Sequence, residues 1–245
     1  MDTKRTYNYR IEPRDVDFMR RATLMALVDY LLHTAGEDAD RNGFGVRDLN
    51  LNNASWVLTR LAVEIDRMPD EYEPVRVTTW VSNITRAMTT RNFDILDARG
   101  ERIAGAVSNW AMIDLSSRRL LDLHQLAAYD TMTQDFPLPA ALPHRLATPH
   151  PTEQFTHTVA YSDLDFNGHA NSVKYLQWVI DTLPLEWLRS RRFARVEINY
   201  LQETRHGDVL ALLAERSADD CLYEIRNARD ETACRIACRI ACHMV

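Results

Sequence analysis

The chain has 245 residues, of which 46% are hydrophobic and 26% are charged, a balance typical of a globular protein with a buried core. Its formal net charge of −6 argues against a nucleic-acid-binding function, because phosphate binding requires a basic surface. The first ten residues lack the apolar segment of a signal peptide, and no apolar run is long enough to span a bilayer. These features predict a cytoplasmic protein without a membrane span.

The first half of the chain is expected to form a strand, a long helix and then several antiparallel strands. Apolar residues recur at helical spacing from Leu24 to Ala35, and we expect this helix to end near Gly36. The sequence Ala-Arg-Gly-Glu at 98–101 predicts a hairpin turn. The expected strands cover residues 4–11, 55–66, 75–83, 89–97 and 102–114.

The second half repeats this order of elements. Apolar spacing predicts a helix that begins near Val173, reaches Leu183 and is interrupted near Pro184. An amphipathic helix gains most of its stability by burying its apolar face. Each half is therefore expected to be a curved antiparallel sheet wrapped around its helix, and the two halves form a pseudo-dimer. The expected strands cover residues 153–161, 194–203, 208–216, 220–227 and 231–244.

A proline-rich segment separates the two halves. Five of the nine prolines fall between residues 137 and 151, a composition typical of an extended linker. We therefore divide the chain into an N-terminal unit at 1–115, a linker at 116–152 and a C-terminal unit at 153–245. A short helix is expected in the linker, around residues 120–129.

The loop Asp163–Asn171 contains two carboxylates, an imidazole and two carboxamides just before the second helix. An offset of 148 residues aligns it with a segment of the first half, so that Asp15, Asp17 and Phe18 match Asp163, Asp165 and Phe166. At this offset Met19 and Arg21 replace Asn167 and His169. The comparison predicts a duplicated fold in which only the second copy keeps a working site.

Four segments of this sequence carry a resemblance to a known family, namely Ser162–Trp178, Trp56–Asp66, Thr79–Ser82 and Ser108–Asp114. They resemble segments of the acyl-ACP thioesterases of bacteria and plant plastids. The resemblance covers nearly the whole chain. It implies an α+β tandem (double) hotdog fold, in which two antiparallel sheets each wrap around a long central helix.

The resemblance also implies an activity, namely hydrolysis of fatty acyl-ACP to free fatty acid and holo-ACP at the end of fatty acid synthesis. The matching site residues are Asp165, Asn167, His169 and Glu203, the last on the following strand. Many plant members carry a cysteine after this glutamate, whereas this chain has Thr204, which favours a carboxylate-driven mechanism over a Cys-His mechanism. No cofactor or metal is implied.

Two other functions remain open at the level of sequence, an acyl-CoA thioesterase of the same fold and a non-catalytic acyl-binding hotdog protein. The expected partner is acyl carrier protein, bound as its acyl-phosphopantetheine form. Because that carrier is acidic, we expect a local basic patch for docking. Its candidates are Arg189, Arg191, Arg192 and Arg195. The chain is expected to be a monomer, as a pseudo-dimer, or a homodimer.

Several chemical roles are open for the site residues. Asp165 or Glu203 could activate water as a general base, or Asp165 could attack the thioester to form a mixed anhydride. Asn167 would orient the water or the carbonyl, and His169 would orient a carboxylate and move a proton to the departing thiolate. Free N–H groups of the loop before the helix are expected to offer an oxyanion site.

Asp163 is expected to be mainly structural and would cap the turn or pair with an arginine. Asn171 stands where a helix N-cap is useful, and capping and catalysis are equally open for it. Cys234, Cys238 and Cys242 recur every four residues, which places them on one face of a strand as buried thiols. Their spacing is not that of a zinc site.

Overall fold

The computed structural model describes residues 4–125 and 133–242. The chain divides into two compact units, Met1–Pro143 and His144–Val245. Each unit is an antiparallel sheet with a helix on one face, and the two are described separately below.

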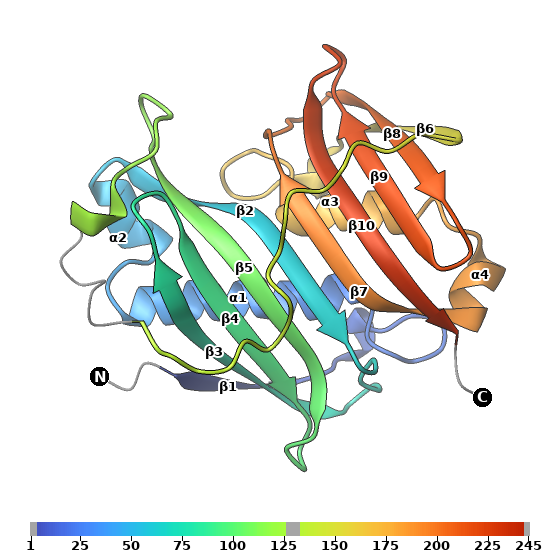
Figure 1. Ribbon diagram of the computed structural model, residues 1–245, viewed down its shortest axis with the longest axis horizontal. Helices are drawn as coiled ribbons and strands as arrows, with labels where there is room; N and C mark the ends of the chain where they lie inside the picture. Colours follow the sequence, from blue (N-terminus) through green and yellow to red (C-terminus); the bar gives the residue numbers. More distant parts are fainter. Residues whose placement is uncertain (1–3, 126–132, 243–245) are drawn as a thin grey trace. The chain divides into compact units, whose positions relative to one another are not determined.

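The first unit contains a five-stranded antiparallel sheet in the order β1-β3-β4-β5-β2 (Figure 1). Its strands lie within one or two residues of the expected positions, and Gly100, with a φ of 86°, occupies the predicted hairpin turn between β4 and β5. One short helix, α2 (Val46–Leu51), was not predicted from the sequence. The strands are β1 (Arg5–Arg10), β2 (Ala54–Ile65), β3 (Pro74–Ile84), β4 (Thr89–Leu96) and β5 (Arg102–Asp114).

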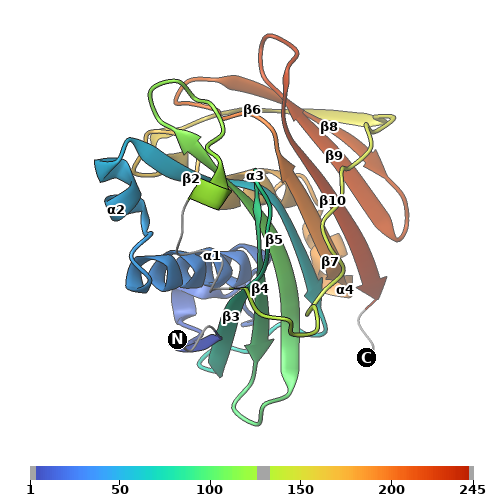
Figure 2. The same ribbon diagram turned by 60° about the vertical axis from the view of Figure 1, so that its left-hand side comes forward.

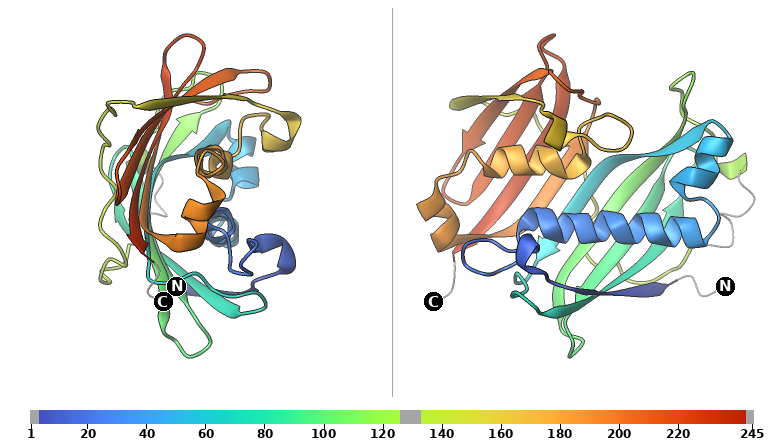
Figure 3. Two further views of the ribbon diagram at one scale, coloured as in Figure 1. Left: turned by 90° about the vertical axis from the view of Figure 1, so that its right-hand side faces the viewer. Right: turned by 180° about the vertical axis from the view of Figure 1, so that it is seen from behind.

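Helix α1 (Leu24–Arg41) crosses one face of this sheet (Figure 3). The expectation that it ends near Gly36 is wrong, because the helix continues for more than one further turn. Gly36 is exposed, while Asp38 and Ala39 extend the buried stripe beyond it. A glycine inside a helix costs about 1 kcal/mol relative to alanine, and burial of the next turn outweighs that cost.

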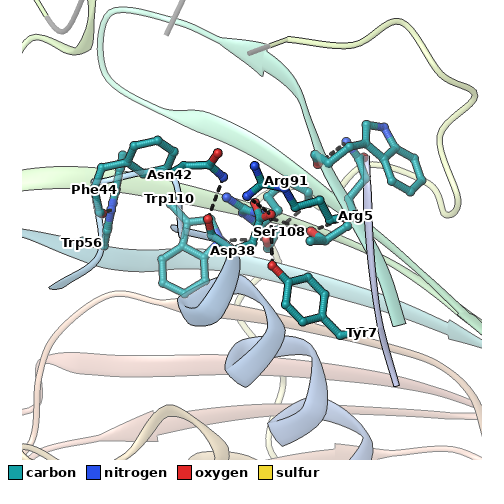
Figure 4. A network of polar contacts seen from close by, with 12 residues as sticks. Arg5, Tyr7, Asp38, Asn42, Phe44, Trp56, Arg91, Ser108 and Trp110 are labelled. Atoms are coloured by element: carbon teal, nitrogen blue, oxygen red, sulfur yellow. Dashed lines mark hydrogen bonds and ion pairs between the residues drawn. The ribbon is translucent and has the colours of Figure 1, made fainter. Parts of the chain in front are cut away.

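The core between α1 and the sheet of the first unit includes a buried ion pair (Figure 4). Arg91 Nη1 on β4 lies 2.6 Å from Asp38 Oδ2 on α1, and both side chains are 7% exposed. Arg91 also donates to Thr79 Oγ1 at 3.2 Å, and the Tyr7 hydroxyl donates to Asp38 Oδ1 at 3.3 Å. Burial, together with the neighbouring Asp38 carboxylate, raises the pKa of Tyr7. Polar groups therefore occupy a position where a core is usually apolar.

The second unit has the sheet order β7-β10-β9-β8-β6 (Figure 1). Its main helix α3 (Ser172–Ile180) is shorter than expected, and Leu183 lies in the turn that follows it. Pro184 is the N-cap of a separate helix, α4 (Leu185–Ser190), which confirms the predicted interruption. The strands are β6 (Glu153–Thr158), β7 (Arg191–Tyr200), β8 (Val209–Arg216), β9 (Asp220–Arg226) and β10 (Thr232–Cys242).

Residues 134–152 form no helix or strand. In the first unit this segment passes over the sheet face opposite α1, as Figures 1 and 2 show. Its Pro139 carbonyl oxygen comes so close to Gly105 that a Cβ built there would lie 2.3 Å away. In the second unit Leu146 N donates to the buried Asn199 Oδ1 at 2.9 Å. Of the short helix expected around 120–129, a 3-10 turn at Leu123–Gln125 is present, and residues 126–129 lie outside the described residues.

Candidate active site

The candidate loop begins with a short 3-10 turn, Tyr161–Asp163, that is closed by Asp163. The Asp163 side chain is buried, and its Oδ2 accepts hydrogen bonds from Ala160 N at 2.9 Å and from His157 Nε2 at 3.0 Å. Burial alone would raise the pKa of Asp163, but these hydrogen bonds outweigh it and hold the pKa below the ordinary value. Asp163 therefore caps the turn, and the side chains paired with its carboxylate are those of His157 and Lys174 (3.9 Å), not the arginine that was expected.

Asp165 holds the loop in a tight turn. Its Oδ1 accepts from Asn167 N at 2.8 Å and from His169 N at 3.1 Å. Its own N–H donates to His169 O at 2.7 Å, and its carbonyl accepts from Gly168 N at 3.0 Å. Gly168 has a φ of 75°, the left-handed conformation that this turn needs. A Cβ at Gly168 would meet nothing within 4 Å, so the glycine serves the backbone conformation.

The loop then pairs with the segment that carries Glu203. Ala170 N donates to Thr204 O at 2.8 Å, and His169 forms an isolated β-bridge with Arg205. This pairing brings His169 Nε2 to 3.2 Å from Glu203 Oε2, with the two side chains 19% and 35% exposed. An imidazole and a carboxylate from distant parts of the sequence therefore meet at a solvent-accessible position.

Glu203 lies beyond the strand on which it was expected. Strand β7 ends at Tyr200, and the chain turns because Leu201 N and Gln202 N both donate to Ala233 O, at 2.9 and 3.0 Å. Glu203 therefore belongs to a loop, and its position depends on the bond between Ala170 and Thr204 described above.

Asn167 is exposed, and its side chain lies on the same loop as His169. Asn171 accepts a hydrogen bond from Val173 N at 2.9 Å through Oδ1, so it is the N-cap of α3 as expected. Of the four site residues predicted from the sequence, the structure brings His169 and Glu203 into side-chain contact and joins Asp165 to His169 through the backbone.

Thr204 faces the interior, with 1% of its surface exposed. Its hydroxyl lies 2.8 Å from the hydroxyl of Tyr175 on α3, and burial raises the pKa of Tyr175. The Thr204 side chain is thus held in the core and does not reach the exposed face on which His169 and Glu203 meet.

The expected oxyanion site from free loop N–H groups is wrong for most of the loop. The N–H groups of residues 165, 167–171, 173 and 174 all donate to acceptors within the second unit. The sequence could not show this, because the acceptors include the Asp165 and Asn171 side chains and the Thr204 carbonyl. Most N–H groups of this loop are therefore unavailable to a developing oxyanion, which favours side-chain donors.

The first unit repeats the backbone frame of this loop around Asp17. Asp17 Oδ1 accepts from Met19 N at 2.7 Å and from Arg21 N at 3.2 Å. Asp17 N donates to Arg21 O at 2.8 Å, as Asp165 N does in the second unit. The alignment of the two loops by sequence is confirmed at the level of individual hydrogen bonds.

The structure adds a third replacement that the sequence comparison missed. Ala22 N donates to Pro69 O at 2.8 Å, which is the counterpart of the bond from Ala170 to Thr204. The residue before Pro69 is Met68, so a methionine stands where the second unit has Glu203. The sequence did contain a signal, because an acidic residue follows five positions later in both units, Glu73 after Met68 and Asp208 after Glu203. These segments align at a different offset from the 148 residues that align the two loops.

Four further expectations concern the docking arginines, the thiols, metal binding and membrane spans. The side chain of Arg195, one of the four arginines of the expected docking patch, is 14% exposed. Its Nη2 lies 3.0 Å from Glu197 Oε2, so its charge is paired within the sheet. Cys234 and Cys238 are buried on β10 as free thiols. Within residues 4–125 and 133–242, no group of three or more His, Cys, Asp or Glu side chains could hold a metal ion. None of the helices in these two ranges is long and apolar enough to cross a membrane.

Two family models match this chain. Residues 2–126 match the acyl-ACP thioesterase N-terminal domain, and residues 148–240 match the acyl-ACP thioesterase C-terminal domain. Together the two matches cover most of the sequence, and the loop with His169 and the segment with Glu203 both lie within the second.

Plant plastid enzymes are among the similar curated proteins. The oleoyl-acyl carrier protein thioesterase of Coriandrum sativum is 26% identical over 232 residues, which cover 84% of this chain and 61% of that protein. The palmitoyl-acyl carrier protein thioesterase of Gossypium hirsutum is 27% identical over 220 residues, covering 84% of this chain and 53% of that protein. The chain thus spans about half to three fifths of the length of these relatives.

Solved structures match over the whole chain. An acyl-ACP thioesterase from Bacteroides thetaiotaomicron is 37% identical with a TM-score of 0.91, and the match covers 98% of both chains. The 12:0-ACP thioesterase from Umbellularia californica has a TM-score of 0.87 at 19% identity and covers 99% of this chain and 98% of that one. The predicted double hotdog fold is confirmed.

Proposed function

Because the chain belongs to the acyl-ACP thioesterase family, we propose that it hydrolyses fatty acyl-ACP to free fatty acid and holo-ACP, ending fatty acid synthesis. The observation that carries this proposal is the contact between His169 Nε2 and Glu203 Oε2 at 3.2 Å. It supplies an acid–base pair at a solvent-accessible position, and the corresponding positions of the first unit hold Arg21 and Met68.

In the proposed reaction the His169–Glu203 pair takes a proton from a water molecule while the water oxygen attacks the thioester carbonyl carbon. The resulting tetrahedral oxyanion collapses, the carbon–sulfur bond breaks, and the proton passes from the pair to the departing sulfur. The products are the carboxylic acid and the thiol of the carrier. A thiol has an ordinary pKa of about 8.5, so its departure needs less acid assistance than that of an alcohol or amine.

The oxyanion requires a hydrogen-bond donor where charge develops. Most backbone N–H groups of the loop are already used, and this favours side-chain donors. Asn167 is exposed on the same loop as His169, and we assign its carboxamide to the carbonyl oxygen. Removing a single oxyanion donor typically lowers kcat by about 10²–10³-fold.

The proposal is tested by hydrolysis of acyl-ACP substrates of increasing chain length, measured as released thiol and released fatty acid. His169→Ala and Glu203→Gln should each lower kcat by about 10²–10⁴-fold, the range of general acid–base catalysis. His206→Ala is the matched control, because His206 is exposed on the same loop as Glu203, and its activity should stay near that of the wild type.

The same assay separates the related functions. Faster hydrolysis of acyl-CoA than of acyl-ACP with the same acyl chain would show that the substrate is acyl-CoA and not acyl-ACP. Binding of acyl-ACP without release of thiol would show a non-catalytic acyl-binding protein. Near-normal turnover of both variants would reject the assignment of His169 and Glu203.

A further inference from the structure

We propose that Tyr175 and Thr204 are positioning residues, whose buried hydroxyl pair fixes where the Glu203 carboxylate lies. The two hydroxyl oxygens are 2.8 Å apart, and only 3% of Tyr175 and 1% of Thr204 is exposed. This inference rests on the proposed thioesterase function and deepens it, because it names side chains that act on the reaction through another residue, without touching the substrate.

The first argument is that Thr204 is anchored at two points directly beside Glu203. Its carbonyl accepts from Ala170 N at 2.8 Å, which ties it to the loop before α3, and its hydroxyl bonds to Tyr175 on α3 itself. Tyr175 is held in turn, since its ring packs edge-on against the ring of Tyr200 with centroids 5.9 Å apart. A change at either anchor therefore moves the backbone that carries Glu203.

The second argument is the direction of the side chains along this segment. Thr204 is buried, whereas its neighbours Glu203 and Arg205 are exposed. Successive side chains in β-structure point to opposite faces, and the β-bridge between His169 and Arg205 gives the segment that geometry. A buried Thr204 thus turns the Glu203 side chain outward, to the side where its Oε2 lies 3.2 Å from His169 Nε2.

The third argument concerns the hydroxyl groups themselves. A buried hydroxyl requires a hydrogen-bond partner, so each member of the pair satisfies the other. Burial raises the pKa of Tyr175, although the bond to Thr204 lowers it, so the phenol stays neutral and keeps its proton for this bond. Because a hydrogen bond restricts both distance and angle, the pair fixes this segment against α3 more narrowly than apolar packing would.

The fourth argument is that the first unit lacks both the glutamate and the hydroxyl pair. The offset of 148 residues places Leu27 of α1 at the position of Tyr175, and this leucine is equally buried. Pro69 is the counterpart of Thr204, because its carbonyl accepts from Ala22 N at 2.8 Å. A leucine and a proline therefore suffice for this fold, and the two hydroxyls accompany the unit in which a glutamate lies beside a histidine.

The test removes one hydroxyl at a time. Tyr175→Phe and Thr204→Val delete a hydroxyl with little change of shape, and each breaks the same bond. Each should lower kcat for acyl-ACP by about tenfold or more with little change in KM, because a shift of about 1 Å in a reacting group can cost about 10²-fold. Thr204→Ser keeps the hydroxyl and should stay within about threefold of the wild type. A normal kcat in Tyr175→Phe or Thr204→Val, or a loss in Thr204→Ser as large as in Thr204→Val, would overturn the inference.

A second Tyr–Thr pair in the same unit supplies the matched control. The hydroxyls of Tyr223 on β9 and of Thr182, which follows α3, lie 2.9 Å apart, and Tyr223 is fully buried. Tyr223→Phe removes a buried hydroxyl near the end of α3 away from the loop, so it should lower stability and leave kcat unchanged. A fall in kcat as large as that of Tyr175→Phe would show a general effect of stability, and the positioning role would be rejected.

A double-mutant cycle shows whether Thr204 acts through Glu203. In the Glu203→Gln background, Thr204→Val should lower kcat no further, because the carboxylate that it positions is already gone. A merely structural effect of the valine would instead lower kcat by the same factor in both backgrounds. Equal factors in the two backgrounds therefore contradict the inference.

The last readout does not depend on turnover. Hydrogen exchange of the Ala170 amide, which bonds to the Thr204 carbonyl, should become faster in Thr204→Val and stay slow in Thr204→Ser. If Thr204→Val does not fold, the same amide in Tyr175→Phe decides. An unchanged Ala170 amide contradicts the positioning role even in a protein without activity, whereas a wild type that releases no thiol rejects the proposed function alone.

Discussion

Asp163 and Asp165 stand two residues apart in one loop, yet their surroundings differ. Asp163 is buried and bonded to Ala160 N and to the His157 ring, which stacks on Trp178 with ring centroids 4.4 Å apart. Asp165 is only partly buried and bonds to the backbone of its own loop. Because Asp163 is the more enclosed of the two, its charge matters for the stability of the fold.

Asp163→Asn should therefore destabilise the protein in a pH-dependent way. The folded-state pKa of Asp163 lies below its ordinary value of about 3.9, so its charge contributes stability above that pH and loses it as pH falls through the folded pKa. Hydrogen bonds to a charged group contribute about 1.5–3 kcal/mol. Urea unfolding should show a deficit of this order at pH 7 that shrinks below about pH 4. Glu186→Gln, at an exposed position on α4, is the control. A deficit that does not change with pH would contradict the account.

At the scale of elements, one cross-strand position separates the cores of the two units. In the first unit Arg91 on β4 faces Ser108 on β5, and in the second unit Cys221 on β9 faces Cys238 on β10. The equivalence follows from the hairpins, since Asp97 and Asn227 cap the two turns with matching hydrogen bonds. The same framework thus accepts either Arg91 opposite Ser108 or two buried thiols, so the fold itself does not require an arginine at this position.

The ion pair between Arg91 and Asp38 should accordingly behave as a coupled unit in stability. Removing one partner takes the main counter-charge from a buried group, although Arg5 Nη1 stays 3.6 Å from Asp38 Oδ1. Such a loss typically costs about 3–5 kcal/mol, whereas replacing both partners by apolar residues is often neutral. Arg91→Met and Asp38→Leu should each lower the free energy of unfolding by this amount, and the double variant should lose much less than their sum. Chemical unfolding of all four proteins in a double-mutant cycle measures the coupling. Additive losses would show that the two side chains act independently.

The sequence predicted the existence and order of most elements, because alternating and helical apolar spacing depends on local burial. It failed where tertiary packing overrides a local signal. Gly36 resembles a helix end but lies within α1, because the following turn is buried against the sheet. Glu203 resembles a strand residue but follows β7, because Ala233 accepts two hydrogen bonds that turn the chain. Helix α2 is too short to leave a periodic pattern.

At the scale of the whole molecule, duplication was visible in the loop because Asp17 and Asp165 keep the same spacing to their neighbours. The loss of the glutamate in the first unit was not visible, since Met68 and Glu203 are related only through backbone bonds to Ala22 and Ala170. His169 and Glu203 are far apart in the sequence. The family resemblance assigned them to one site, and the fold shows the contact between their side chains. The catalytic roles of the four residues named from the sequence stay predictions, namely those of Asp165, Asn167, His169 and Glu203.

The asymmetry of the two units predicts one working site per chain. Arg21 and Met68 cannot form an acid–base pair, and Arg21 Nη2 lies 2.9 Å from the sulfur of Met19. Inactivating the second unit by His169→Ala should therefore remove nearly all turnover, with at least about a 10²-fold fall in kcat. A non-hydrolysable acyl-carrier analogue should bind with one molecule per chain in calorimetry, whatever the oligomeric state. Arg21→Ala is the matched variant in the first unit, and it should leave both kcat and this stoichiometry unchanged. If the first unit also worked, His169→Ala would keep about half of the activity and two analogues would bind.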